Sequence, residues 1–446
     1  MEQEQLENIL DKIKTAGADS ADVLIARKNS AHVSTRFGKT ESLEHSEGLD
    51  MGLRVFKGRK QAIVSTNDLS DHAVDQAIER AVAMVQHIPE DEYCGLAEPE
   101  IYAENWQEKL ALLDLEDKNT VPVEKLLEHA ARAEETALAV EGVSNSEGAS
   151  ASWGRDHYSY MTSNGFFGAY SSTGGSLSVS VLAGEGTEME RDYAWCTACH
   201  FDDLDAPEDL GREAAEKTVR RLNPRKIDTM QVPIVFDPLV SASIVRHLSG
   251  AISGASVARG TSFLKNEVCN KIFADGVTIT DDPKMPRGLR SNPFDDEGVA
   301  SEKMNFVENG ELTNWILDLH AARQLNLTTN GRASRGISSP PSPSATNLYM
   351  QAGEVSPSDL ISDIKSGLYV TEMMGHGINM VTGDYSRGAF GYWIENGEIT
   401  YPVSEITIAG NLKDMWMHLT PANDLVHRYG VDAPTFRIDG MTIAGN

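Results

Sequence analysis

The sequence predicts an α+β fold: an N-terminal sheet-and-helix domain at residues 1–225, then a β-rich, mainly antiparallel C-terminal domain at residues 226–446. Three observations lead to this prediction. Before residue 225, apolar residues at helical spacing alternate with stretches of period two. After it, the chain consists mostly of short apolar runs separated by turn-forming residues. A length of 446 residues is ample for two domains.

Five helices are expected, each from apolar residues three or four positions apart. Their expected ranges are 3–16, 71–87, 122–140, 207–221 and 238–252. The last has a clear start, because Asp237 is a favoured N-cap and Pro238 suits the first helical position.

Strands are expected between and after these helices. Residues 21–66 and 143–200 alternate in short runs bounded by glycine, whereas residues 88–121, rich in Pro, Asp and Glu, predict a connection. In the C-terminal domain, Asn309-Gly310 and Asn396-Gly397 stand between apolar runs and predict tight hairpins, since both residue types accept a positive φ.

A tripeptide that occurs twice in the sequence suggests a duplicated unit in the N-terminal domain. Ser46-Glu47-Gly48 and Ser146-Glu147-Gly148 are each followed by strands and then by a helix. We interpret this as two copies of a sheet-plus-helix unit.

Charge and hydropathy exclude several classes of function. The chain has 67 acidic against 39 basic residues, a net charge of −28, so binding of nucleic acid through a basic face is excluded. No run approaches the ~20 apolar residues that a membrane helix needs. The first residues are acidic, where a secretory signal would be basic. The sequence therefore predicts a cytoplasmic protein that binds neither nucleic acid nor membrane.

Familiar catalytic motifs do not occur in the sequence. No histidine is followed by glutamate and no two histidines lie four apart, so a helical zinc-protease motif made by this chain is not expected. Cys196-Thr197-Ala198-Cys199-His200 matches a haem-attachment or redox pattern. However, cysteines three apart on a strand point to opposite faces, so we interpret them as structural.

Two further features have open interpretations. His376, between Gly375 and Gly377, is either an exposed site residue or part of a turn. The segment 328–347, rich in Pro, Ser and Gly, is either a functional loop or an irregular excursion.

Six stretches carry a resemblance to a known family. They are residues 33–38, 189–194, 291–299, 382–389, 391–399 and 401–415. Together they resemble the TldD/PmbA metallopeptidase family, formerly called modulators of DNA gyrase, and within it the PmbA/TldE type of subunit. The resemblance runs nearly from end to end.

The resemblance implies a cytoplasmic, metal-dependent peptidase of two related subunits. It would act on small or unfolded polypeptides, in peptide maturation and antitoxin degradation. In the TldD subunit, a helix carries His-Glu-x-x-x-His and a C-terminal cysteine completes the metal site. Here that motif falls on Arg246, His247 and Ala251 of the helix starting at Pro238, and no cysteine follows Met415.

These replacements remove the metal site from this chain. A guanidinium has no lone pair to donate and alanine has no ligand atom. One histidine cannot hold zinc, which takes three protein ligands in a catalytic site. We therefore expect no catalytic residue, metal or cofactor in this chain, and a divalent metal, zinc, in a TldD-like partner.

Contacts with substrate or partner are expected elsewhere. His376, Tyr385 and Arg387 are the candidates, because they lie in a glycine-rich setting, and the segment 328–347 is a candidate gate. The chain alone could also form a homodimer. Two alternatives remain: a regulatory binding protein of the gyrase-modulator type, or an active peptidase that uses distant residues such as His376 and His418.

Overall fold

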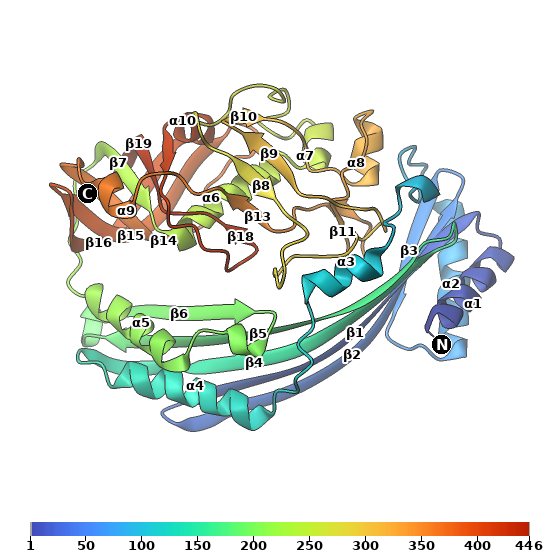
Figure 1. Cartoon of the computed structure of the whole chain (residues 1–446), viewed down its shortest axis with the longest axis horizontal. Coiled ribbons are helices and arrows are strands. Elements are labelled where there is room, and N and C mark those ends of the chain that lie inside the picture. The colour runs from blue at the N-terminus through green and yellow to red at the C-terminus, as the bar shows by residue number, and fades with distance from the viewer. Residues whose placement is uncertain (1, 446) are drawn as a thin grey trace.

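A long, curved antiparallel sheet forms the N-terminal part of the protein in the computed structural model, which describes residues 2–445 (Figure 1). Its strand order is β3-β2-β1-β4-β5-β6. The strands are β1 (Ser20–Arg36), β2 (Lys39–Lys57), β3 (Lys60–Thr66), β4 (Val143–Thr162), β5 (Phe167–Ala183) and β6 (Glu190–Ala198).

Helices cover one face of this sheet. They are α1 (Glu2–Thr15), α2 (Asp71–His87), α4 (Val123–Leu138) and α5 (Pro207–Arg220), which confirms the four helices expected here. The odd-numbered residues of β1 pack under them: Val23 and Ile25 under α1 and α2, and Val33 under α4 and α5. Side chains alternate along a strand, so the even-numbered residues face the other way, toward the C-terminal domain.

The segment predicted as a connection contains one more helix, α3 (Trp106–Leu113). Its eight residues are too few to show a helical period. It is held by burial of Trp106 against Phe166 and Phe294, in an aromatic cluster that joins the two domains. Three short 3₁₀ turns also occur, at Pro99–Ile101, Gly186–Glu188 and Phe201–Asp203.

The N-terminal domain repeats the order helix, three strands, helix, first as α1-β1-β2-β3-α2 and then as α4-β4-β5-β6-α5. The two copies meet where β1 pairs with β4. The echoed tripeptides are not equivalent, however: Ser46–Gly48 lies in the second strand of its copy and Ser146–Gly148 in the first strand. The repeat is in the arrangement of elements and not in that short match.

The C-terminal domain contains a mixed sheet of order β16-β15-β14-β7-β19-β17. Because β16 also pairs with β19, five of these strands close into a ring. The strands are β7 (Met230–Phe236), β14 (Ser366–Met374), β15 (Asp384–Glu395), β16 (Glu398–Asn411), β17 (Leu419–Pro421) and β19 (Phe436–Ala444). The predicted boundary at residue 225 lies between the end of α5 and the start of β7.

Shorter strands build a second sheet and a small hairpin in the same domain. The sheet contains β8 (Ile279–Asp281), β9 (Met304–Glu308), β10 (Glu311–Leu312), β13 (Leu348–Met350) and β18 (Val431–Asp432), and the hairpin contains β11 (Ala333–Ser334) and β12 (Ser342–Pro343). Both predicted Asn-Gly hairpins are confirmed, with positive φ at Asn309, Gly310, Asn396 and Gly397.

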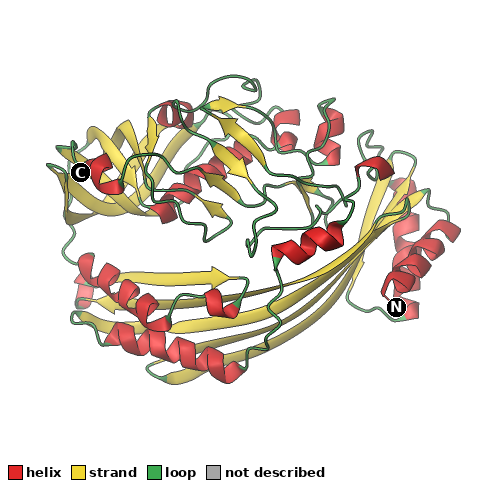
Figure 2. Cartoon of the chain, viewed as in Figure 1, coloured by secondary structure: helices red, strands yellow, loops and turns green. Residues whose placement is uncertain are grey.

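One helix, α6 (Pro238–Ala251), lies in the middle of this domain (Figures 1 and 2). Its Ile244, Val245 and Leu248 share a single core with residues of the ring and of the second sheet. The remaining helices are α7 (Gly254–Ala258), α8 (Leu319–Gln324), α9 (Pro357–Ile361) and α10 (Leu412–Met417). Among residues 2–445, no helix combines the length and apolar composition needed to cross a membrane.

Candidate functional site

Helix α6 begins as the sequence predicts. The Asp237 carboxylate accepts a hydrogen bond from the Leu239 N–H, and Pro238 occupies the first turn. Its apolar face is buried in the core, which leaves Ser243, Arg246 and His247 toward the polar side. These positions include the first two of the family's metal motif.

His247 is held in a neutral form by its surroundings. Burial, and then the positive charges of Arg387 and Arg246, lower the pKa of His247 to about 4. Its Nε2 atom is fully buried and has no hydrogen-bond partner among residues 2–445. An unpaired buried nitrogen is costly, which makes this ring a candidate for contact with a ligand.

Tyr385 and Arg387, two of the predicted candidates, lie on the same face of β15 and beside His247. The rings of Tyr385 and His247 are 6.1 Å apart between centroids. Burial raises the pKa of Tyr385, and nearby Arg387 offsets part of that rise. Arg387 donates to the Met373 carbonyl at 3.4 Å, and its Nε is buried without a partner. The structure thus brings Tyr385, Arg387 and His247 into one cluster.

His376, the third candidate, lies apart from this cluster. It is exposed in the connection between β14 and β15, where no residue in 2–445 gives it a hydrogen bond or an ion pair. The neighbouring Gly377 is required by packing, since a Cβ there would lie 1.4 Å from the Ser386 carbonyl oxygen. The glycines around His376 therefore have a structural reason in the turn.

The residues at the motif position do not fit a metal ion. Arg246 is exposed and Ala251 is buried in the apolar core, and neither side chain has a lone pair to offer. Arg246 and Arg387 also place positive charge beside His247, which repels a cation. Within the part of the chain that the structure describes, no group of three His, Cys, Asp or Glu side chains has the arrangement of a metal site.

Cys196 and Cys199 are buried free thiols at the end of β6. Burial raises the pKa of each thiol to about 11, so both are protonated at neutral pH. Cys196 belongs to the core beneath α4 and α5. A buried, protonated thiol is a poor nucleophile and a poor ligand, which supports the structural interpretation.

A cavity of about 710 Å³ lies between the open face of the N-terminal sheet and the C-terminal domain. Residues of the sheet form one wall, among them the small polar residues Ser30, Ser152 and Ser172 and the aromatic residues Tyr158 and Tyr170. The opposite wall comes from residues 288–292 and from the segment 328–347.

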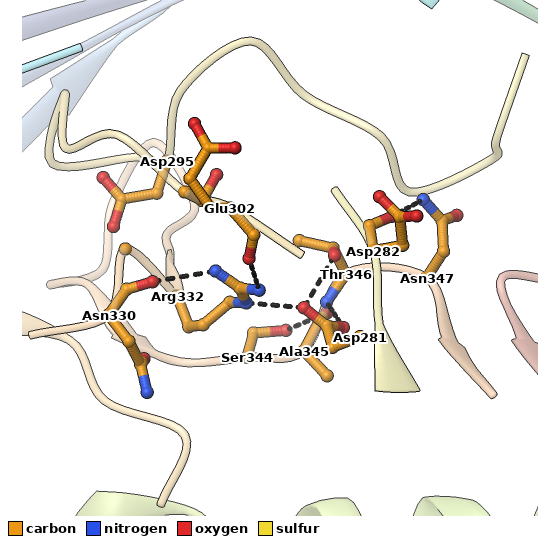
Figure 3. A network of polar contacts seen from close by, with 12 residues as sticks. Asp281, Asp282, Asp295, Glu302, Asn330, Arg332, Ser344, Ala345, Thr346 and Asn347 are labelled. Atoms are coloured by element: carbon orange, nitrogen blue, oxygen red, sulfur yellow. Dashed lines mark hydrogen bonds and ion pairs between the residues drawn. The ribbon is translucent and has the colours of Figure 1, made fainter. Parts of the chain in front are cut away.

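Arg332 fixes part of that second wall (Figure 3). Its guanidinium donates to the Asp281 carboxylate and to the backbone carbonyls of Glu302, at 2.6 Å, and Asn330, at 2.8 Å. Asp281 also accepts from the Thr346 N–H and hydroxyl, at 2.7 and 2.8 Å. Both carboxylate oxygens of Asp281 therefore accept hydrogen bonds.

Arg335 links this second wall of the cavity to the N-terminal sheet through an ion pair. Its Nη1 lies 2.6 Å from Asp22 of β1, and Arg54 of β2 lies 2.6 Å from the same carboxylate. Although burial favours the neutral acid, the two guanidiniums outweigh it and lower the pKa of Asp22. At Gly52 a Cβ would lie 2.2 Å from the Ile337 carbonyl oxygen. The candidate gate 328–347 is thus anchored at Arg332 and Arg335.

Buried acids of a neighbouring turn complete this junction between the domains. Burial and, after it, the negative charge of the nearby Asp295 together raise the pKa of Glu297 to about 8. Burial likewise raises the pKa of Asp295 to about 7, although its carboxylate accepts three backbone N–H bonds, including those of Val299 and Ala333. Both acids are held partly in the neutral form at pH 7.

Sequence reasoning did not single out Arg290, Asp22 or Asp281. Asp22 and Arg335 are 313 positions apart, so no local pattern links them. Arg290 lies in an irregular stretch that carries no period. Only the family stretch at residues 291–299 pointed to this region.

Comparison with known proteins identifies the family. Three domain models match the chain: PmbA/TldA metallopeptidase domain 1 over residues 21–85, the central domain over 116–222 and the C-terminal domain over 229–445. Metalloprotease PmbA of Escherichia coli O157:H7 is 38% identical over 97% of this chain and 94% of its own length. The PmbA homolog of Haemophilus influenzae is 36% identical over 98% and 94%.

Solved structures have the same fold. A protein of Bacteroides thetaiotaomicron named as a modulator of DNA gyrase superposes with a TM-score of 0.90 at 26% identity, covering 100% of this chain and 99% of that one. TldE of Thermococcus kodakarensis superposes with a TM-score of 0.86 over 99% and 100%, and at 21% identity this likeness concerns the fold alone. The chain belongs to the PmbA/TldD metallopeptidase family.

Proposed function

We propose that this chain is the PmbA/TldE-type subunit of a cytoplasmic, two-chain, metal-dependent peptidase, and that a TldD-like partner holds the metal, zinc. The observation that carries the proposal is the cluster on α6 and β15. Arg246, His247 and Ala251 occupy the motif, and Arg387 adds positive charge where a metal would need negative or neutral ligands. Such a cluster can contact a peptide or a partner, but it cannot activate water through zinc.

The substrates would be small or unfolded polypeptides, cleaved during peptide maturation and antitoxin degradation. The family membership and the metalloprotease names of its relatives support a peptidase role. The cavity between the domains, lined by serine hydroxyls together with aromatic and charged side chains, supports a role in holding a flexible chain. This subunit would then position substrate and complete the enclosure around the partner's metal.

A reconstitution experiment tests the proposal. The chain, a TldD-like protein from the same source and their mixture are each incubated with a fluorescent unfolded peptide and zinc. Cleavage that is strong only in the mixture, together with co-elution of the two chains in gel filtration, is the expected result. Zinc-dependent cleavage by this chain alone would overturn it.

Affinity purification of the tagged chain distinguishes the two-chain peptidase from a regulatory binding protein. If the tagged chain captures gyrase and no TldD-like protein, the regulatory alternative holds instead. Light scattering on the isolated chain measures whether it forms a homodimer. A homodimer that persists unchanged when the TldD-like protein is added would contradict the two-chain enzyme.

A further inference from the structure

Arg290 is the arginine of the cavity wall that has no partner. Its guanidinium has no hydrogen bond or ion pair with any residue from 2 to 445, whereas Arg332 and Arg335 in the same wall are each paired with a carboxylate. Its position is nevertheless fixed. The Arg290 N–H donates to the Asn347 side-chain oxygen at 3.0 Å, and its stem packs so closely on Gly430 that a Cβ there would lie 2.6 Å from Cγ.

A second arginine adds to this positive charge. Arg290 is an exposed residue with part of its side chain withdrawn from water; this partial burial and the repulsion from Arg246 of α6 lower the pKa of Arg290, and Asp281 offsets part of the effect. The close contacts of Asp281 are with Arg332 and Thr346, and no ion pair joins it to Arg290 in the described residues. The guanidiniums of Arg290 and Arg246 thus repel each other, and neither forms an ion pair among residues 2–445, in a chain whose net charge is −28.

The other carboxylates of the cavity are already engaged. Asp296 accepts a hydrogen bond from the Arg335 N–H at 2.7 Å. Asp156 lies near the Tyr158 hydroxyl and opposite Lys28 on the neighbouring strand. Neither carboxylate forms an ion pair with Arg290 in the described residues, so the Arg290 guanidinium lines the cavity without an anionic partner.

We propose that Arg290, aided by the positive charge of Arg246 nearby, binds the carboxylate of a peptide that enters this cavity. A planar guanidinium matches a carboxylate with two parallel hydrogen bonds, which are stronger than bonds between neutral groups. The ligand is a peptide and not a simple anion, because about 710 Å³ lies in the range of sites that enclose a drug-sized molecule. Tyr170 and the hydroxyls of Ser30 and Ser172 line the same space and suit a polar main chain.

This inference rests on the proposed function, which makes the ligand a peptide. It adds that the carboxylate of the peptide contacts Arg290 and so orients the peptide in the cavity. A C-terminal carboxylate is present on every unmodified polypeptide, so reading it requires no particular sequence. An aspartate or glutamate side chain offers the same chemistry. The two sources are separated by the choice of peptides below.

The test measures binding to the isolated full-length chain by fluorescence anisotropy. Three N-terminally labelled pentapeptides are compared: Gly-Ser-Ala-Val-Leu with a free carboxylate, the same peptide with a C-terminal amide, and the amide with Glu in place of Ala. We expect the free acid to bind about tenfold or more tightly than the plain amide, as loss of a charged hydrogen-bond pair implies. Binding of the Glu peptide alone would assign the site to acidic side chains.

Variants then assign the preference to one residue. Arg290→Gln should abolish the difference between acid and amide, Arg290→Lys should retain part of it, and Arg246→Gln should reduce it less. Arg80→Gln, on α2 across the sheet from the cavity, is the matched control and should change nothing. Equal binding of all three peptides, no binding of any, or an unchanged preference in Arg290→Gln would overturn the proposal. These assays need no partner, so their failure is distinct from a failure of the reconstituted peptidase.

Discussion

Two groups of arginines in this molecule have opposite surroundings. Arg54, Arg332 and Arg335 are buried and each meets a carboxylate within hydrogen-bond distance. Arg246, Arg290 and Arg387, around α6 and the cavity, meet none in the described residues. The first group joins strands and domains, whereas the second leaves positive charge available. Charge pairing therefore separates the structural arginines from those that can bind a ligand.

The arginines paired with a carboxylate should contribute more to the free energy of unfolding than the unpaired arginines do. Asp22→Ala would leave Arg54 and Arg335 buried without their shared partner, and removing one side of a buried ion pair costs about 3–5 kcal/mol. Urea unfolding monitored by circular dichroism measures the loss. Asp75→Ala is the control, because its pair with Lys12 lies on the surface and should contribute far less. Equal losses in the two variants would break the comparison.

The buried acids of the junction should give stability an unusual dependence on pH. The folded pKa values of Asp295 and Glu297, about 7 and about 8, lie above those of the unfolded chain. The folded state then holds protons that the unfolded chain has released, so the free energy of unfolding falls as pH rises from about 4 and levels off above about 8, by up to ~1.4 kcal/mol per pH unit for each proton. Unfolding curves from pH 6 to 9 measure this slope.

A matched variant tests the assignment of that slope. Glu297→Gln keeps the shape of the side chain and removes its charge, so the decline above pH 7 should become shallower. Glu302→Gln, an exposed acid in the same stretch, should leave the slope unchanged. If stability instead rises with pH in this range, the raised pKa values are contradicted.

The pKa of His247 is a probe of the unpaired arginines Arg246 and Arg387. Its pKa of about 4 means that the ring is neutral near pH 7 and becomes charged only in acid. Because this value lies below that of free histidine, the resulting stability is present above about pH 6.5 and declines as pH falls toward 4. Arg387→Gln should raise the pKa of His247, as followed by NMR of the ring resonances. A ring that titrates near 6.5 in the unaltered chain would contradict both the burial of His247 and its proximity to the two arginines.

The smallest effect on stability is expected from substitution of the unpaired arginines. Arg290→Gln and Arg246→Gln should change the free energy of unfolding by no more than about 0.5 kcal/mol, because neither breaks a pair. Arg335→Gln, measured alongside, should be strongly destabilising. A loss in Arg290→Gln that approaches the loss in Arg335→Gln would place Arg290 in the structural group.

Local pattern predicted both Asn-Gly hairpins and the five longest helices, but not the short helices α7 to α10, because caps, periods and Asn-Gly turns act over a few residues and a helix of five or six residues shows no period. It missed α3, whose stability comes from Trp106 packing on distant aromatic rings. It could mark Tyr385 and Arg387 only by their glycine-rich setting. Their meeting with His247 depends on the closed ring of strands around α6, and the pair of Asp22 with Arg335 depends on the packing of the two domains.

The zinc content of the purified chain tests the central claim most directly. The chain is loaded with zinc, passed through gel filtration and analysed by mass spectrometry, alone and in complex with the TldD-like protein. We predict that the isolated chain retains no more zinc than a buffer blank, while the complex retains it in proportion to the TldD-like protein. One tightly held zinc per isolated chain would contradict the proposal that the partner supplies the metal.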